Sequence, residues 1–393
     1  MVQGDDGAWD LPTMTFPEYV PIDGAFTWHV SQRIGAPATR VRTVARQDDD
    51  RVVEMELHGE PPPETTRWVA VAELDDEAVR AWRTDRDAVP PERPAWQRPG
   101  WWNEATAWVE DELARVGHTR SGAIEQLKHW SISAVLMVPT DRGGVVLKQV
   151  PPLFAAEGPL IELLHGLVPG SVPEPLAVDR SNHRWLMVRF DGSPDTGAPD
   201  DALRRLAELQ RATVGRRDEI LGVGCPDRGL DRLEQDVLAL ADRADLLDPA
   251  VRKKLGAALP DLTRRVAVLR EAGLPETVVH GDFHQWNSVA SPDGSFIVFD
   301  WTDAAWGHPF MDLSAWLGRS KDQAASVATY LDGWAAERPA DDLRRAWSEA
   351  EPLSYLHYAI GYQRIIEGTH DPSWSPELGR LVECALSVAS GDG

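Results

Sequence analysis

The spacing of apolar side chains predicts a chain that begins with short strands and continues as helices. Up to residue 190, apolar and polar positions form short runs separated by polar turns, which is typical of β-strands. Strands are predicted at 39–45, 51–57, 67–71, 124–129, 134–138, 145–150 and 184–188, with helices at 74–82 and 101–116. From residue 201 onward apolar positions recur at helical spacing, with one helix interrupted at Pro260 and others at 323–338 and 341–350. The pattern predicts an α+β protein.

One segment breaks this pattern and marks a domain boundary. Residues 89–100 contain four prolines, which remove backbone donors and stiffen the chain. We therefore predict an accessory α/β module over 1–88, a proline-rich linker over 89–100, a small β-rich lobe over 101–190 and a helical lobe over 191–393.

Charge and composition exclude several classes of partner. The 393 residues carry 40 basic and 63 acidic side chains, a net charge of −23, so neither nucleic acid nor an anionic membrane is an expected partner. Cys225 and Cys384 are isolated and form no disulfide framework or metal-ligand spacing. The first residues lack a signal-peptide pattern and no apolar run is long enough to span a bilayer, so a cytoplasmic protein is expected, of undetermined oligomeric state.

Oxygen-bearing side chains gather in one segment between two apolar strands. The first strand ends at Val279, the next loop carries Asp282 and Asn287, and the second strand ends at Asp300. A turn predicted at 292–294 lets these two strands form a hairpin, with the three side chains converging at one end of it. A carboxylate can orient a nucleophilic hydroxyl, while an amide and a second carboxylate can hold Mg²⁺ against phosphate oxygens.

These residues resemble a known family, the aminoglycoside phosphotransferase and choline kinase family, which shares the protein-kinase-like fold. The resemblance covers roughly 101–370 and rests on three motifs: His280-Gly281-Asp282-Phe283-His284-x-x-Asn287, Phe299-Asp300-Trp301 and Gly307-His308-Pro309-x-x-Asp312-Leu313. It implies a bilobal fold with a β-rich N-lobe and a helical C-lobe. It also implies transfer of the γ-phosphoryl group of Mg²⁺-ATP to a hydroxyl group of a small molecule.

The resemblance assigns roles to the catalytic segment and to one lysine. Asp282 would accept or orient the acceptor proton, and Asn287 and Asp300 would bind Mg²⁺. Lys148 lies in an apolar strand, where its ammonium group needs a partner, and would hold the phosphates. Glu157 would hold this lysine in position, with Glu162 as the alternative.

Further residues are expected around the nucleotide and the acceptor. Ser131 and Ser133 lie in the loop where protein kinases have a glycine-rich loop, and the backbone from Val188 to Phe190 would bind adenine. His280 and Asp312 are expected to support the catalytic loop. The acceptor is expected to contact Trp286 and three residues of a late helix: Tyr358, Tyr362 and Glu367.

Three functions remain open at this point. The leading one is a kinase of an aminoglycoside-like antibiotic or a related metabolite, conferring antibiotic resistance; the second is a sugar or amino-alcohol kinase. The third is a nucleotide-binding pseudokinase that serves as an interaction module. Two departures from the family bear on the acceptor and the metal: Trp286 replaces a small residue, and Thr302, followed by Asp303, replaces an acidic one. The choice between ATP and GTP stays open.

Overall fold

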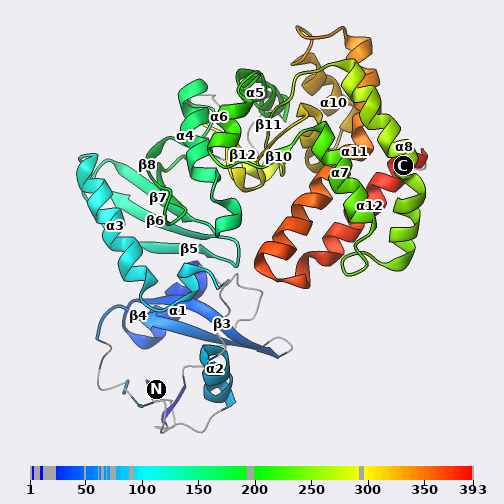
Figure 1. The fold of residues 1–393 in the computed structure, drawn as a ribbon. Helices are drawn as coiled ribbons and strands as arrows, with labels where there is room; N and C mark the ends of the chain where they lie inside the picture. Colours follow the sequence, from blue (N-terminus) through cyan, green and yellow to red (C-terminus); the bar gives the residue numbers. More distant parts are fainter. Residues whose placement is uncertain are drawn as a thin grey trace. The chain divides into compact units, whose positions relative to one another are not determined.

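The computed structural model describes residues 2–3, 9–11, 24–47, 50–60, 62, 66–67, 69–70, 77–87, 93–192, 199–291 and 296–391. The chain divides into two compact units (Figure 1). The first is Met1–Pro151 with Arg184–Leu186, and the second is Pro152–His183 with Met187–Gly393. The first is rich in strands and the second in helices, which confirms the predicted α+β class.

The first unit contains most of the predicted strands. Its elements are β1 (Val2–Gln3), β2 (Trp9–Asp10), α1 (Gly24–Ile34), β3 (Ala38–Gln47), β4 (Asp50–Leu57), α2 (Glu77–Asp87), η2 (Ala95–Gln97), α3 (Trp101–Arg115), β5 (Glu125–His129), β6 (Ala134–Thr140) and β7 (Gly143–Gln149). The predicted strand at 67–71 is wrong in its described residues, because Arg67, Val69 and Ala70 lie outside any strand. The helix predicted at 74–82 corresponds to α2, which begins at Glu77.

The sheet of the first unit follows the alternation of its sequence. β5, β6, β7 and β9 (Arg184–Val188) are adjacent in that order, and β6 and β7 are antiparallel. Alternate residues of β6 are buried, which is the period-two pattern of a strand with one face in the core. The hairpin turns at Asp141 and Arg142 and re-enters the sheet at Gly143, whose φ of 106° favours glycine.

Hydrogen bonds join the predicted accessory module to this sheet. The Arg40 amide donates to Gln126 Oε1 at 3.0 Å, and Gln126 Nε2 donates to the Arg40 carbonyl at 3.1 Å. The Arg40 guanidinium also donates to the His129 carbonyl at 2.9 Å. β3 and β5 are therefore tied together inside one compact unit, and the separate module over 1–88 stays a prediction.

The second unit is built mainly of helices. Its elements are η3 (Pro152–Phe154), α4 (Glu157–Leu167), β8 (Pro175–Asp179), α5 (Pro199–Ala212), α6 (Arg217–Gly222), β10 (Asp227–Arg228), α7 (Leu230–Ala241), α8 (Pro249–Ala272), β11 (Thr277–Val279), η4 (Gln285–Asn287), β12 (Ser288–Ala290), β13 (Phe296–Val298), η5 (Trp301–Asp303), β14 (Ala305–Gly307), η6 (Pro309–Asp312), α9 (Leu313–Leu317), α10 (Gln323–Asp332), α11 (Ala340–Thr369), η7 (Pro372–Trp374) and α12 (Ser375–Ser390).

Two helices continue through prolines. The predicted interruption at Pro260 is wrong, because α8 runs unbroken from Pro249 to Ala272. Likewise α11 contains Pro352 and joins the predicted 341–350 segment to the late helix, whereas α10 ends at Asp332, short of the predicted 338. A proline removes one helical hydrogen bond. Burial of apolar residues on both sides of it, such as Leu255 and Leu262 in α8, favours continuing the helix.

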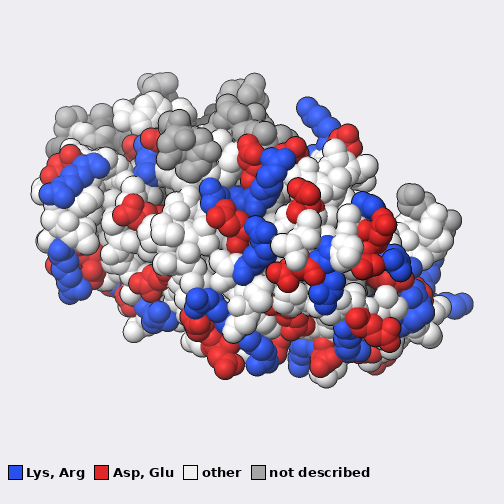
Figure 2. All heavy atoms as spheres, turned by 90° about the horizontal axis from the view of Figure 1, so that it is seen from above, with Lys and Arg blue, Asp and Glu red and all other residues white. Residues whose placement is uncertain are grey.

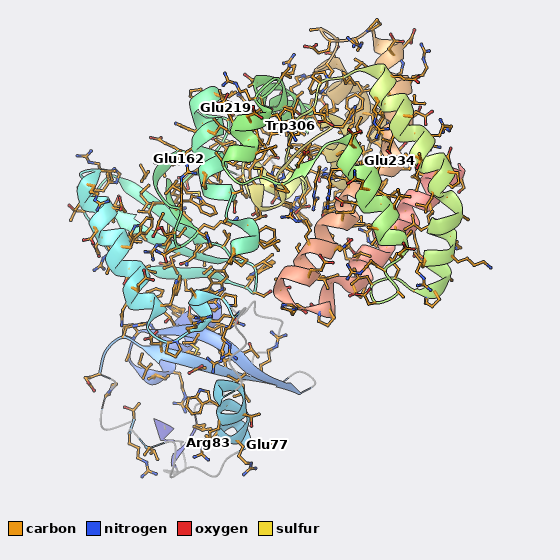
Figure 3. All side chains as sticks on the ribbon, in the orientation of Figure 1. Glu77, Arg83, Glu162, Glu219, Glu234 and Trp306 are labelled. Carbon is orange, nitrogen blue, oxygen red and sulfur yellow. The ribbon has the colours of Figure 1, made fainter. Side chains whose placement is uncertain are left out.

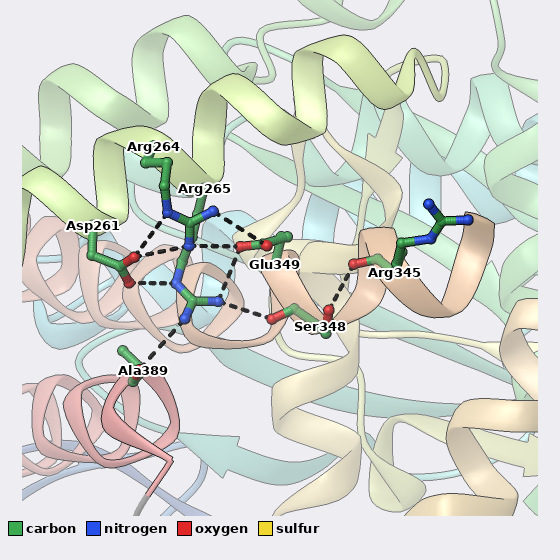
Figure 4. A network of polar contacts seen from close by, with 7 residues as sticks. All are labelled: Asp261, Arg264, Arg265, Arg345, Ser348, Glu349 and Ala389. Atoms are coloured by element: carbon green, nitrogen blue, oxygen red, sulfur yellow. Dashed lines mark hydrogen bonds and ion pairs between the residues drawn. The ribbon is translucent and has the colours of Figure 1, made fainter. Parts of the chain in front are cut away.

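The long helices are also joined by an ionic network. Arg265 of α8 donates from Nε to Asp261 at 2.7 Å, from Nη1 to the Ser348 carbonyl of α11 at 3.0 Å, and from Nη2 to the Ala389 carbonyl of α12 at 3.4 Å (Figure 4). One guanidinium group therefore connects three helices of the second unit.

The strands around the catalytic segment differ from the predicted hairpin. β11, which contains Val279, pairs with β14 in a three-stranded sheet of order β10-β14-β11. The hairpin consists of β12 and β13, with Ser288 opposite Val298. The prediction that the strand ending at Val279 pairs with 296–299 is therefore wrong, because the chain forms a further strand after the loop. The predicted turn at 292–294 lies outside the described residues.

The surface carries charges of both signs. On the face drawn in Figure 2, acidic and basic side chains are interspersed. Across the part of the chain that is described, no helix is long and apolar enough to cross a membrane.

Candidate active site

A tight backbone turn brings the catalytic segment against the residues that follow Asp300. Gly281 has a φ of 85°, and a Cβ atom at this position would lie 2.3 Å from the Asp303 carbonyl oxygen. Only glycine fits such an approach without displacing the backbone. The His-Gly-Asp order is thus required by local packing as well as by chemistry.

Asp312 holds this turn from beneath. Its side chain is buried and accepts hydrogen bonds from the His280 amide at 2.9 Å and the Gly281 amide at 2.8 Å. Gln210 Nε2 of α5 donates to the same carboxylate at 2.8 Å. Burial raises the pKa of Asp312 to about 7, and the three donors act in the opposite direction. Asp312 directly precedes α9, but its side chain does not cap this helix. Its hydrogen bonds hold the catalytic loop instead.

His280 is a buried neutral residue. Its Nε2 lies 3.0 Å from the Phe299 carbonyl, and its Nδ1 accepts the Asp282 amide at 3.3 Å, so Nε2 carries the proton. The ring packs on Trp301, with centroids 4.6 Å apart. Burial lowers the pKa of His280 to about 4. These contacts link the catalytic loop to the end of β13 and give His280 no free nitrogen for a metal.

Both oxygens of the Asp282 carboxylate have neighbours. Tyr358 of α11 donates its hydroxyl to Oδ1 at 2.5 Å. Asn287 Nδ2 donates to the Asp282 carbonyl at 2.9 Å and lies 3.4 Å from Oδ2. His284 Nε2 is 3.5 Å from Oδ2. About a quarter of the Asp282 side chain is exposed, so a small molecule can reach it.

The register of β12 and β13 brings the backbone of Asn287 next to the residue that precedes Asp300. The Phe299 amide donates to the Asn287 carbonyl at 3.0 Å, which places Asp300 one residue from the position opposite Asn287. Asp300 has a left-handed conformation, with φ 66° and ψ 56°, that aspartate tolerates better than most residues. The Asn287 amide nitrogen is directed at Asp282, so its oxygen is the atom left for a cation.

This pair fits Mg²⁺ by the nature of its donors. An amide oxygen and a carboxylate are hard ligands, and Mg²⁺ bound to phosphates needs only one or two carboxylate-type ligands from the protein. Within the described ranges, no group of three or more His, Cys, Asp or Glu side chains is arranged to hold a metal.

Sequence reasoning missed the charged residues around Asp303. Desolvation together with the Asp282 charge raises the pKa of the Asp303 carboxyl to about 7, while Arg228 and Arg364 act in the opposite direction. Arg228 is buried and donates to the His357 carbonyl of α11 at 3.4 Å. Arg228 lies in the two-residue strand β10, far from any motif, so no local pattern marks it.

A comparison with protein families decides the class of this site. The profile described as the phosphotransferase enzyme family (APH) matches residues 123–353, more than half of the chain. The chain belongs to this family. It is accordingly a small-molecule phosphotransferase that acts on hydroxyl groups. The match includes every motif that carries the resemblance. No curated protein matches the chain above the significance threshold.

Solved structures of phosphotransferases share the fold. The macrolide 2'-phosphotransferase type I is 16% identical, with a TM-score of 0.52 over 71% of this chain and 97% of its own. The aminoglycoside 2'-phosphotransferase-IIIa in its GDP complex is 18% identical, with a TM-score of 0.52 over 72% and 98%. The choline kinase LicA from Streptococcus pneumoniae is 13% identical, with a TM-score of 0.50 over 72% and 98%. At these identities the likeness shows the protein-kinase-like fold alone.

Three of the predicted nucleotide residues of this phosphotransferase lie in the second unit. Glu157 is buried in the first turn of α4, where Pro159 is tolerated, and α4 packs against η5. Glu162 is instead partly exposed on α4 and pairs with Arg180 at 3.3 Å (Figure 3). Val188 donates its amide to the Glu174 carbonyl, and the Phe190 ring packs 5.1 Å from that of Phe299, next to Asp300.

The other predicted nucleotide residues lie in the first unit. Lys148 is buried in β7, the strand predicted for it, opposite Val135. Its ammonium group is 5.5 Å from the centre of the Trp185 ring. Ser131 and Ser133 lie in the tight turn between β5 and β6, where the Trp130 amide donates to the Ser133 carbonyl at 2.8 Å.

The predicted acceptor residues separate into two groups. Tyr358 contacts Asp282 directly, and its ring lies 5.4 Å from that of Tyr362 on α11, which in turn lies 5.8 Å from the ring of Trp374 in η7. Trp286 is 61% exposed beside the loop, with the Arg319 guanidinium 5.3 Å from its ring.

Glu367 does not share this arrangement. It pairs with Arg243 and accepts from Gln363 at 3.0 Å, about 13 Å further along α11 than Tyr358 at the helical rise per residue. Its contacts are an ion pair with the segment that follows α7 and a hydrogen bond within α11.

Proposed function

We propose that this phosphotransferase transfers the γ-phosphoryl group of ATP to a hydroxyl group of an antibiotic or a related small metabolite. The observation that carries the proposal is the close arrangement of Asp282, Asn287 and Asp300 by one loop and one hairpin, with Asp312 bracing the loop. Phosphoryl transfer depends on positioning and charge neutralisation, and this loop is fixed at both ends.

The residues have separate roles in the proposed reaction. Asp282 orients the acceptor hydroxyl and takes its proton as the bond to phosphorus forms. Asn287 and Asp300 would hold Mg²⁺, which when bound neutralises charge on the phosphate oxygens. His280 and Asp312 keep the loop in place through backbone hydrogen bonds.

The nucleotide is proposed to bind the residues that the family resemblance assigns to it. Lys148 would bind the phosphates, with Ser131 and Ser133 offering amides or hydroxyls, and burial favours Glu157 over Glu162 as the residue that positions the lysine. The Val188 amide already donates to the Glu174 carbonyl. The Val188 carbonyl oxygen and the Phe190 amide are therefore the groups that would bind adenine.

The acceptor is proposed to bind against Trp286, Tyr358 and Tyr362. Tyr358 contacts Asp282, Tyr362 packs beside Tyr358, and Trp286 packs beside His284. Aromatic side chains of this kind suit a large, partly apolar molecule such as an antibiotic. A sugar or an amino alcohol is the second candidate, because it would use the same Asp282 and differ only in what fills the aromatic surface.

The decisive experiment measures nucleotide consumption and product mass. The purified chain is supplied with Mg²⁺ and ATP or GTP, together with aminoglycosides, macrolides, sugars or amino alcohols. A gain of one phosphate group on one class identifies the acceptor. Asp282→Asn should reduce kcat at least about 100-fold, because proton transfer by a positioned group contributes that much. Asp300→Asn should reduce it as strongly.

Asp322→Asn is the matched control, since Asp322 is an exposed helix cap where asparagine functions as well. Full transfer by Asp282→Asn would refute the role of Asp282. Nucleotide binding without transfer to any acceptor would favour the pseudokinase.

A further inference from the structure

The Tyr358 hydroxyl is hydrogen-bonded to Oδ1 of Asp282, one of the two oxygens that could take the proton of a reacting hydroxyl group. It donates to Oδ1 at 2.5 Å, while Oδ2 faces Asn287 and His284 on the side of the loop. A general base must come within hydrogen-bond distance of the proton it removes. About a quarter of the Asp282 side chain is exposed, but water or an acceptor that approaches Oδ1 has to compete with the tyrosine hydroxyl for this oxygen.

The tyrosine is held in this position by its surroundings. Its ring is buried, with only 8% of the residue exposed, and packs beside Tyr362 on the 30-residue helix α11. Burial and the nearby Asp282 charge raise the pKa of Tyr358 far above its ordinary value, so the hydroxyl keeps its proton and remains a donor. The contact joins residues 76 positions apart in sequence and ties α11 to the catalytic loop.

We propose that Tyr358 blocks hydrolysis of the bound nucleotide by keeping water from Asp282 until an acceptor displaces its hydroxyl. The inference rests on the proposed function and adds a positioning role for Tyr358.

The blocked reaction can be written in full. In hydrolysis, the water oxygen forms a bond to the γ-phosphorus as the bond from that phosphorus to the β–γ bridging oxygen breaks. The nucleoside diphosphate leaves with the bonding electron pair, and the proton of the attacking water passes to Asp282 Oδ1 and then to solvent. Removing the tyrosine hydroxyl opens Oδ1 to water and leaves every other group in place.

Tyr358→Phe tests the inference because it removes one oxygen and keeps the ring. Phosphate release from Mg²⁺-ATP and Mg²⁺-GTP without any acceptor should rise about fivefold or more, while the Kd of a non-hydrolysable analogue stays within twofold. Adding Asp282→Asn to Tyr358→Phe should remove the gain. The matched control is Tyr355→Phe, one turn earlier on α11, where the side chain faces Glu351 and Cys384; hydrolysis should not change.

A second measurement does not depend on turnover. The chain has five tyrosines, so labelling the tyrosine Cζ atoms with ¹³C gives few signals, and the Tyr358 signal is the one absent from Tyr358→Phe. This signal should move in Asp282→Asn, where the charged hydrogen-bond acceptor is gone. An unmoved signal would show that the contact is not made in solution and would overturn the inference.

The outcomes separate the two proposals. If the wild type transfers phosphate to an acceptor and Tyr358→Phe hydrolyses nucleotide no faster than the wild type, the inference is wrong and the proposed function stands. If the wild type binds no nucleotide, both fall.

Discussion

The Asp312 carboxylate shows how one buried side chain can fix the geometry of a catalytic loop. Three donors converge on it, and two of them are the backbone amides that define the turn at Gly281. An ionised carboxylate offers four lone-pair sites and carries no proton, so either oxygen can accept any of these donors. An asparagine would have to direct its NH₂ group at one of these donors.

Asp312→Asn should therefore lower the free energy of unfolding by about 3 kcal/mol, because a buried donor left without an acceptor costs about 1–3 kcal/mol. Urea unfolding of the two proteins measures the difference. Asp322→Asn is the matched control: Asp322 accepts the Ala325 amide at 3.0 Å at the exposed start of α10, where asparagine caps equally well. Equal stability of Asp312→Asn and wild type would mean that Asp312 does not brace the loop.

The site was predictable where its residues are close in sequence. Asp282 and Asn287 share a loop, and the strand before Asp300 is marked by its own apolar run, so local spacing brings the three together. Arg228 and His357, whose carbonyl it contacts, are 129 positions apart in sequence, and no periodic pattern predicts a contact over such a separation. The direct hydrogen bond between Tyr358 and Asp282 was beyond sequence reasoning for the same reason.

At the scale of elements, the helices of the second unit show why proline is an unreliable sign of a helix end. Pro260 lies within α8, between turns that bury Leu255 and Leu262. Sequence reasoning weighed the lost hydrogen bond and could not weigh the packing partners, which come from elsewhere in the chain. The pairing of β11 is also decided by a distant part of the chain, because its partner β14 follows it by more than twenty residues. The sequence pattern instead predicts pairing with the nearer apolar run.

Arg265 provides a test of how the long helices hold together. Its side chain is 14% exposed and bonds to main-chain carbonyls of α11 and α12, whereas the neighbouring Arg264 is 49% exposed and bonds only to Asp261 and Glu349. Arg265→Met keeps an unbranched apolar stem and removes the donors. It should lower the free energy of unfolding by about 2 kcal/mol, since hydrogen bonds from charged groups contribute more than neutral ones.

Arg264→Met is the control for this change and should cost less than about 1 kcal/mol, because exposed ion pairs contribute little. Thermal unfolding of both variants gives the comparison. Equal effects of the two substitutions would show that the helices do not depend on the Arg265 crosslink.

At the scale of the whole molecule, sensitivity to acid follows from histidines buried in both units. Burial lowers the pKa of His129 and of His280 to about 4 and that of His308 to about 3, and it lowers the pKa of His357 well below the ordinary value of 6.5. An unfolded histidine titrates near 6.5. Below that pH the unfolded chain therefore binds protons that the folded chain does not, and the free energy of unfolding decreases as the pH is lowered.

The carboxyl groups of Asp303 and Asp312 have the opposite effect on how stability changes with pH. Burial raises the pKa of Asp303 and of Asp312 to about 7, so the folded chain binds protons there that unfolded aspartates, with a pKa near 3.9, do not. Four histidines against two aspartates leave about two protons taken up on unfolding, and the effect of His58, whose pKa burial also lowers, is offset by that of Glu351, whose pKa burial raises. The free energy of unfolding should thus fall by roughly 3 kcal/mol per pH unit between about pH 6 and pH 4.5.

His308→Asn tests this balance with a single group. His308 accepts the Phe310 amide through Nδ1 at the start of η6, and asparagine can accept the same bond. Urea unfolding at a series of pH values should give this variant a slope smaller by about 1.4 kcal/mol per pH unit, one proton fewer. His370→Asn, at an exposed position, should keep the wild-type slope. A chain that becomes more stable from pH 6 to pH 4.5, or a His308→Asn slope equal to that of the wild type, would show that the buried histidines do not control its response to acid.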